Sequence, residues 1–301
     1  MSSTDFTKVA FITGTNSGIG KSLVKEFNQR KVKVYASDVR FSEETSEEFK
    51  NLGNIYTDIV DVTNLDHIIA VRDKIAELEG KIDYLYLNAG IVSVSHATDV
   101  TDEQIFNLYN INLFSNMKAV REFVRLVINA KGTIIFSGSI TKFLPLHSNS
   151  LYVSSKAALD AYAHTLQLEL RGYQVRVLNV LGGYIKTRIF DSHVSTVPES
   201  SIYNFPEYTE IYAQRNAKLA ENAGDSMETD VFAKRVLDQI QVAGLNQVNI
   251  FEGTKSSYLY YVSRLLSTSL LFDKMLNIFG LKFDYRKHLK DDKIEITQYL
   301  A

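Results

Sequence analysis

Hydrophobic residues along the chain fall into short β-branched and aromatic runs that alternate with longer segments of helical spacing. The runs, in order, are Lys8–Thr13, Val32–Ser37, Ile82–Leu87, Gly132–Gly138, Tyr173–Val180 and Asn246–Phe251. Between them apolar residues recur at intervals of three and four, as in Lys21–Arg30 and Ser42–Leu52. Strands that alternate with helices at this spacing need crossover connections, which produce a parallel sheet covered on both faces. The pattern therefore predicts a doubly wound α/β domain.

Local signals mark where two later segments begin. Thr101 and Gln104 have the spacing of a capping box, which predicts a helix that starts after Thr101. From about residue 184 to 226 the pattern loosens and holds two of the three prolines, with aromatic residues in a polar setting. We interpret residues 184–226 as a lid over a site. Regular spacing returns with a predicted helix at Asp230–Val242, so we expect one domain over residues 1–253.

Residues 254–301 form a C-terminal extension with a different pattern. Its apolar residues recur at helical spacing: Tyr258, Tyr261, Val262, Leu265, Leu266, Phe272, Met275, Leu276 and Phe279. Arg264, Asp273 and Lys274 interrupt the pattern, which makes a membrane crossing costly.

Two interpretations of this amphipathic extension stay open. In one it lies in a lipid–water interface, with Lys282, Arg286, Lys287 and Lys290 near anionic headgroups. In the other it is a helix pair that packs on the domain or in a dimer seam.

Composition excludes several classes of protein. The chain has 301 residues, of which 45% are hydrophobic and 23% charged, and a formal net charge of −2. This charge provides no field that would attract nucleic acid, so we expect no nucleic-acid partner. There is no cysteine, and the six histidines are scattered without ligand spacing, so we expect no metal site. We see no signal peptide and no run of 18 apolar residues, and we expect a protein at the cytoplasmic side.

A glycine-rich turn follows the first predicted strand. Gly14, Gly18 and Gly20 stand between that strand and the next helix, where a tight turn and close approach to a pyrophosphate both require glycine. The expected cofactor contacts in this turn are Gly14, Asn16, Ser17, Gly18, Ile19 and Gly20. The turn therefore predicts binding of a dinucleotide.

Asp38 ends the second predicted strand, eighteen residues after Gly20. A carboxylate there can accept hydrogen bonds from ribose hydroxyls and would repel a 2′-phosphate, which favours NAD(H) over NADP(H). Arg40 keeps NADP(H) open, because a guanidinium two residues away can hold a phosphate.

Ser139, Tyr152 and Lys156 are the candidate catalytic groups. Ser139 follows a strand end, and Tyr152 and Lys156 are four residues apart on one face of a predicted helix. We expect the Lys156 ammonium to lower the pKa of the Tyr152 phenol and to bond a nicotinamide ribose. Ser139 would then donate to a substrate oxygen while Tyr152 exchanges a proton during hydride transfer.

With these motifs in order, the chain from Lys8 to Phe251 resembles the short-chain dehydrogenase/reductase family, whose members have the Rossmann fold. The matching motifs are Thr13–Gly20, Asp61-Val62, Leu87–Gly90, Asn112, the set of Ser139, Tyr152 and Lys156, and Gly182–Thr187. Two positions depart from the family pattern, since Leu87 replaces an asparagine and Gly182 a proline.

The resemblance assigns further roles. It implies that Asn112 joins the catalytic set by supporting a water chain to the lysine, and that Thr187 bonds the carboxamide. The other cofactor contacts that it implies are Asp61, Val62, Asn88, Ala89, Gly90, Gly183 and Ile185.

Within this family, the chain is similar to fungal 1-acyldihydroxyacetone-phosphate reductases in residues 199–207 of the lid, residues 132–139, Gly182–Thr187 and the hydrophobic C-terminal extension. That similarity implies a lipophilic ketone or secondary alcohol as substrate, such as an acylated glycerol precursor, and association with endoplasmic reticulum or lipid droplets. Those relatives use NADPH. Two alternatives stay open: a steroid or general carbonyl reductase, and a non-catalytic nucleotide-binding protein at a lipid surface. We also expect a homo-oligomer.

Overall fold

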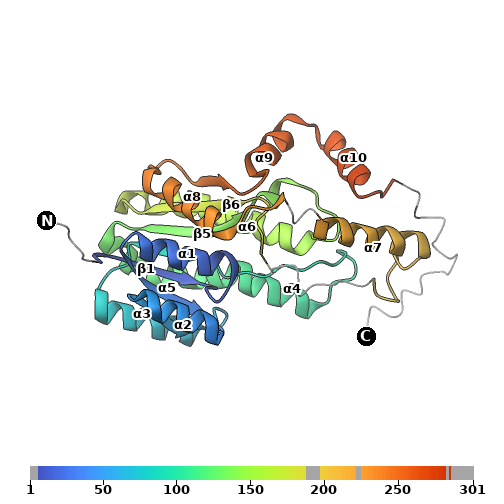
Figure 1. Ribbon diagram of the computed structural model, residues 1–301. Coiled ribbons are helices and arrows are strands. Elements are labelled where there is room, and N and C mark those ends of the chain that lie inside the picture. The colour runs from blue at the N-terminus through green and yellow to red at the C-terminus, as the bar shows by residue number, and fades with distance from the viewer. Residues whose placement is uncertain (1–5, 188–196, 222–224, 283–284, 286–301) are drawn as a thin grey trace.

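The computed structural model describes residues 6–187, 197–221, 225–282 and Tyr285. Their centre is a sheet of seven parallel strands in the order β3-β2-β1-β4-β5-β6-β7 (Figure 1). The strands are β1 (Lys8–Thr13), β2 (Val32–Asp38), β3 (Ile55–Ile59), β4 (Tyr84–Leu87), β5 (Thr133–Ser139), β6 (Arg176–Gly182) and β7 (Asn249–Glu252). The doubly wound fold that the sequence predicts is confirmed.

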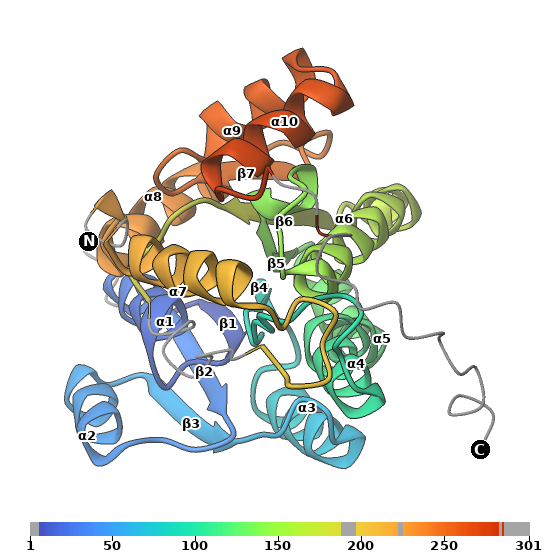
Figure 2. The same cartoon turned by 90° about the vertical axis from the view of Figure 1, so that its right-hand side faces the viewer.

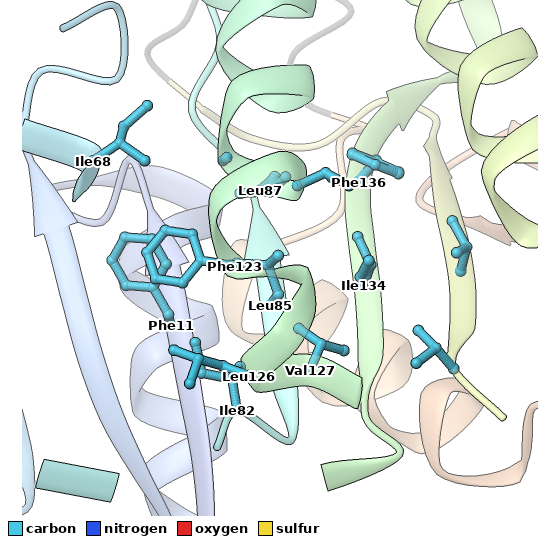
Figure 3. Close-up of a cluster of buried hydrophobic side chains, with 14 of the residues drawn as sticks. Phe11, Ile68, Ile82, Leu85, Leu87, Phe123, Leu126, Val127, Ile134 and Phe136 are labelled. Atoms are coloured by element: carbon cyan, nitrogen blue, oxygen red, sulfur yellow. The ribbon is translucent and has the colours of Figure 1, made fainter. Parts of the chain in front are cut away.

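Helices cover both faces of this sheet. One face carries α1 (Gly18–Gln29), α2 (Glu43–Leu52) and α8 (Thr229–Val242). The other carries α3 (Leu65–Glu79), α5 (Ser115–Ala130) and α6 (Ser150–Leu170). Figure 3 shows the core between the sheet and the second group of helices, where the rings of Phe11 and Phe123 stack. The centroids of these two rings are 4.8 Å apart. Each fully buried phenylalanine of these cores contributes about 1.5–3 kcal/mol to the stability of the fold, so the helices pack firmly on both faces of the sheet.

The strand order reverses between β1 and β4, which places a crevice outside their carboxyl ends. The loops that follow β1, β4 and β5 all emerge at this edge. The helices α4 (Asp102–Tyr109) and α7 (Pro206–Glu221) lie beyond it, as Figure 2 shows. The sheet topology thus brings the glycine-rich turn, the loop after β4 and Ser139 to one side of the molecule.

Two elements differ from the sequence prediction. The strand β3, at one edge of the sheet, was not predicted, because polar Thr57 and Asp58 interrupt its five residues and leave no apolar run. The lid contains the sixteen-residue helix α7, although its sequence looks irregular. Among the α7 side chains that the structure describes, Tyr208 and Tyr212 are buried, one turn apart, and polar neighbours hide the helical period.

The C-terminal extension begins as two helices, α9 (Ser256–Leu265) and α10 (Thr268–Ile278), which project from the body (Figure 1). Ser256 is buried, and its hydroxyl donates to the Leu181 carbonyl at 2.7 Å, which ties the start of α9 to β6. Among the described helices, none combines the length and the apolar character that a bilayer crossing requires. Of the basic residues expected near headgroups, Arg286, Lys287 and Lys290 lie outside the described residues.

Candidate active site

The glycine-rich turn leaves room only for backbone. Gly14 and Gly18 have φ angles of 70° and 55°, in the left-handed region that favours glycine. A Cβ on Gly20 would overlap the carbonyl oxygen of Gly14 and would lie 2.8 Å from the Asn88 side-chain nitrogen. The turn is therefore a cradle whose surface is main chain at the N-terminal end of α1, which suits a pyrophosphate.

Asn88 joins this turn to the loop after β4. Its side-chain nitrogen donates to the carbonyl oxygens of Thr13 and Gly14, both at 3.0 Å. The Thr13 hydroxyl in turn accepts from the backbone N–H groups of Asn88 and Ala89, also at 3.0 Å each. Thr13 was not among the predicted contacts, although its place at the end of β1 was visible in the sequence.

Asp38 and Asn16 lie together at the end of β2. The Asp38 carboxylate accepts from the backbone N–H of Asn16 at 2.9 Å, so the acidic group directly supports the phosphate-binding turn. Arg40 is exposed beside it. Asp61 lies past β3, where its carboxylate accepts from the backbone and hydroxyl of Thr63 at 2.9 and 2.7 Å.

The remaining predicted contacts lie around the same edge. Val62 lines a small hollow with Thr13 and Leu87, between β1, β4 and α5. After β6, Thr187 approaches within 3.7 Å of the Cβ position of Gly18. Gly183 donates its backbone N–H to Glu252 at 2.8 Å, and Ile185 packs against the core under α1. Ser17 and Ile19 flank Gly18 at the start of α1.

Asn112 is fully buried in a five-residue π-helical turn, Asn110–Phe114, between α4 and α5. Its amide accepts from the Ile91 backbone N–H at 2.8 Å and donates to the Ile91 carbonyl at 2.9 Å, which closes a two-bond clamp on the loop after β4. A Cβ on Gly90 would lie 3.3 Å from the Asn112 oxygen and 3.5 Å from Lys156 Nζ. Glycine at position 90 thus allows the asparagine and the lysine to share one small space.

Lys156 is 5% exposed, and its ammonium donates to the Ser137 carbonyl at 2.8 Å. Burial lowers the pKa of Lys156 to about 8. Ser137 also donates its hydroxyl to the Asn88 side-chain oxygen at 2.9 Å, so it links the lysine to the phosphate-binding turn. Ser137 was not among the predicted site residues, because it contributes a backbone carbonyl that only the strand geometry directs at Lys156.

Ser139 is positioned to donate to Tyr152. Its oxygen accepts from the backbone N–H and the hydroxyl of Thr141, at 3.2 and 2.8 Å. With both lone pairs used in this way, its own proton is left for the hydrogen bond with the Tyr152 phenol.

The predicted effect of Lys156 on the Tyr152 phenol is wrong for this structure. Burial raises the pKa of Tyr152, while the hydrogen bond from Ser139 acts in the opposite direction and is the smaller effect. Lys156 Nζ lies 5.6 Å from the Tyr152 ring centroid and is bonded to Ser137 instead. The phenol is therefore neutral at pH 7, with its proton available to an acceptor.

The lid contributes an aromatic and polar cluster beside this site. Tyr208 of α7 is fully buried, and its hydroxyl is bonded to His96 Nε2 and lies 3.4 Å from His147 Nε2. His96 Nδ1 lies 3.1 Å from the Asp99 carboxylate, and the His96 ring stacks on Tyr203 with centroids 4.2 Å apart. These rings join the lid to the loops after β4 and β5, which lie next to Asn112 and Ser139.

Comparisons with known proteins agree with this geometry. The profile of the short chain dehydrogenase family matches residues 8–197. The chain is 33% identical over 259 residues to the NADPH-dependent 1-acyldihydroxyacetone phosphate reductase of Saccharomyces cerevisiae, covering 85% of each protein. It is 31% identical over 263 residues to the protein of the same name from Schizosaccharomyces pombe, covering 83% of this chain and 87% of that protein.

A similar fold occurs in a crystal structure of a short-chain dehydrogenase from Streptomyces avermitilis. The TM-score is 0.74 at 19% identity, with 93% of this chain and 98% of the other covered. Together with the glycine cradle and the grouped Asn112, Ser139, Tyr152 and Lys156, the profile match leads to one conclusion: the chain belongs to the short-chain dehydrogenase/reductase family.

Proposed function

We propose that the protein reduces the ketone of a lipophilic substrate to a secondary alcohol. The observation that carries this proposal is the half-buried, neutral Tyr152 phenol, which is hydrogen-bonded to Ser139. A neutral phenol is the proton donor that a developing alkoxide requires. Ser139 donates its only hydroxyl proton to the Tyr152 phenol oxygen, which leaves the phenol proton for the substrate oxygen. The Lys156 ammonium adds a positive charge close to Gly90 in the loop after β4.

The glycine cradle fits a dinucleotide, since its surface is main chain at the N-terminal end of α1. A side chain at Gly20 would displace the Gly14 backbone, and the Asn88 side chain holds the turn through its bonds to Thr13 and Gly14. The residues that would hold it are the turn Gly14–Gly20, Asp38, Asn88 and Thr187. The nicotinamide group, when bound, supplies the hydride. The protein's own residues orient the substrate oxygen and deliver the proton to it.

We propose further that NAD(H) is the preferred cofactor, although the two yeast relatives are named NADPH-dependent. The support is Asp38, whose negative charge at the end of β2 opposes a 2′-phosphate. We expect a higher kcat/KM with NADH than with NADPH, and an increase of about tenfold in relative use of NADPH for Asp38→Asn. Glu43→Gln, a nearby exposed acid on α2, is the matched control. A wild-type preference for NADPH would contradict this role of Asp38.

The substrate class that we propose is an acylated glycerol-type ketone, in line with the names of the yeast relatives. We take the aromatic lid residues as support for a lipophilic substrate, because Phe205, Tyr208 and Tyr212 gather in one cluster and Tyr208 packs against His96 and His147 of the loops after β4 and β5. The competing assignments are a steroid and a small general ketone. Initial rates with 1-acyldihydroxyacetone phosphate, a ketosteroid and a short aliphatic ketone, each with both cofactors, separate the three.

Tyr152→Phe is the decisive variant for the reaction type. We expect turnover to fall by about 10³-fold, because general acid catalysis contributes roughly 10²–10⁴. Binding of the dinucleotide, followed by fluorescence, should change little. Tyr162→Phe, a half-buried tyrosine of the same helix that packs on Phe136, is the control. Undiminished turnover in Tyr152→Phe would contradict the proposed mechanism.

We also propose that the extension docks on an anionic lipid surface. Seven large hydrophobic side chains of α9 and α10 are exposed: Tyr258, Tyr261, Leu265, Leu270, Phe272, Leu276 and Ile278. Between residues 264 and 282 three cations, Arg264, Lys274 and Lys282, accompany one carboxylate, Asp273. Apolar side chains flanked by excess positive charge suit an interface with anionic headgroups.

Co-sedimentation with phosphatidylcholine vesicles, with and without phosphatidylserine, tests this docking. Phe272→Asp should weaken binding to the anionic vesicles about tenfold or more, because it places a charge in the buried part of the interface. The control is Phe106→Asp, which changes an exposed side chain of α4. Unchanged binding of Phe272→Asp, or light scattering that shows the same face closing a dimer, would contradict the proposal.

A further inference from the structure

The first helix of the extension packs on the segment that follows Ser139. This segment is a single 3-10 turn, Ile140–Phe143, and Ser139 is its N-cap residue. The ring of Tyr260 on α9 meets the ring of Phe143 edge-on, with centroids 5.2 Å apart. Tyr260 also contacts Phe251 of β7 at 4.7 Å. Tyr260 therefore joins the end of this turn to the last strand of the sheet.

Arg264 covers the same ring from one helical turn further along α9. Its guanidinium carbon lies 5.3 Å from the centroid of Phe143 and 5.6 Å from that of Tyr260. A guanidinium over an aromatic face is attracted by the ring quadrupole, so Arg264 holds the two rings together. The Arg264 side chain is otherwise exposed, on the rim of this contact.

The opposite side of the turn is fixed by α6. Lys142, whose side chain is 6% exposed, forms an ion pair with Asp160 of α6 and lies 4.4 Å from the Phe143 centroid. Asp160 also accepts from the Asn179 side chain of β6 at 2.8 Å. The turn thus lies between α6 and α9: Lys142 pairs with α6, and Phe143 packs on α9.

Such support matters because a four-residue 3-10 turn has little stability of its own. Within it, Thr141 donates two hydrogen bonds to Ser139 and so sets the direction in which the Ser139 proton points. A shift of Phe143 would move Thr141 and turn that proton away from Tyr152. The N-terminal end of α9 is fixed to the sheet, because the hydroxyl of buried Ser256 donates to the Leu181 carbonyl of β6.

We infer that Tyr260 and Arg264 are positioning residues for the reaction: through Phe143 they hold the 3-10 turn that aims Ser139 at Tyr152. They touch no reacting atom. The inference rests on the proposed function for its kinetic consequence, and on the contacts of α9 alone for its structural one. Both residues lie outside residues 8–197, the part of the chain that the family profile matches.

The test compares Tyr260→Ala and Arg264→Ala with Tyr258→Ala, which removes an exposed tyrosine from another face of α9. Tyr260→Phe keeps the ring and should restore wild-type behaviour. We expect kcat for ketone reduction to fall about tenfold in the first two variants, because small displacements of catalytic groups are costly. The dissociation constant for the dinucleotide should stay within about twofold of the wild-type value, as its cradle lies on β1 and α1.

Two further measurements separate positioning from general damage. The hydrogen bond from Ser139 lowers the pKa of the Tyr152 phenol, so its loss should move the alkaline limb of the kcat profile to higher pH. Hydrogen exchange of the peptide covering residues 139–144 should also become faster, and this measurement needs no turnover.

Different results test the positioning role of Tyr260 and Arg264 and the proposed ketone reduction. Faster exchange and a shifted pH profile in Tyr260→Ala, with neither in Tyr258→Ala, support the inference. Unchanged exchange in Tyr260→Ala, or equal effects in Tyr258→Ala, overturn it. A wild-type protein that reduces no tested ketone contradicts the proposed function, whereas faster exchange confined to the Tyr260 and Arg264 variants still supports the positioning contact.

Discussion

Replacing Lys156 by methionine should stabilise the protein while it removes a group of the active site. The ammonium is 5% exposed and is bonded to the Ser137 carbonyl. Burial lowers the pKa of Lys156 from 10.5 to about 8. At 1.36 kcal/mol for each pKa unit, the buried charge lowers the free energy of unfolding by about 3 kcal/mol. Between these two values the unfolded chain binds the proton more tightly than the folded chain. The destabilisation by the buried charge is therefore fully present below pH 8 and disappears as the pH rises toward 10.5.

At pH 7 we expect Lys156→Met to raise the free energy of unfolding by about 2 kcal/mol, because the lost bond to Ser137 offsets about 1 kcal/mol of the gain. Between pH 7 and about 9.5 the advantage of the variant over the wild type should shrink by about 2 kcal/mol. Urea unfolding of both proteins at both pH values measures this. The control Lys50→Met removes an exposed lysine of α2 and should show no such trend. A gap between variant and wild type that stays constant with pH would refute the reasoning.

Three other predictions concern the cradle, a helix start and the lid. Gly20→Ala should weaken dinucleotide binding at least about tenfold in a fluorescence titration, because its Cβ meets backbone; Gly172→Ala, where no atom lies within 4 Å, should bind normally. Thr101→Ala removes an observed capping box and should cost about 1 kcal/mol in urea unfolding, and a loss below about 0.2 kcal/mol would count against it. Tyr208→Phe should lower the free energy of unfolding by about 1 kcal/mol, since it leaves His96 without its phenol partner while the ring packing stays; equal stability would show that this bond contributes nothing.

Elements with strong local signals could be predicted from the sequence. The observed α4 begins at Asp102, and both hydrogen bonds of its capping box are present. Buried central strands such as β1 have continuous apolar runs, and the glycines of the first turn have the backbone angles that the motif requires. The edge strand β3 and the lid helix α7 lack such signals, because polar residues interrupt the apolar run of β3 and surround the buried Tyr208 and Tyr212 of α7.

For the site, the residue types could be predicted but not their ionisation. Sequence spacing places Tyr152 and Lys156 on one helix face, from which we expected the ammonium to act on the phenol. In the fold, the Ser137 carbonyl takes the ammonium, and burial raises the pKa of the phenol. Desolvation and main-chain acceptors depend on how strands and helices pack, and no spacing rule contains that information.

Side chains of the lid and of the C-terminal extension pack together in one buried cluster. Phe205, Tyr208 and Tyr212 of the lid share a buried cluster with Leu281, which follows α10. Tyr260 of the same extension packs on Phe143, at the end of the 3-10 turn that follows Ser139. The proposed cofactor cradle and the proposed proton donor lie within residues 8–197, which the family profile matches. The aromatic residues of the lid and Tyr260 follow this part of the chain, so we expect changes there to alter substrate choice and turnover more than cofactor affinity.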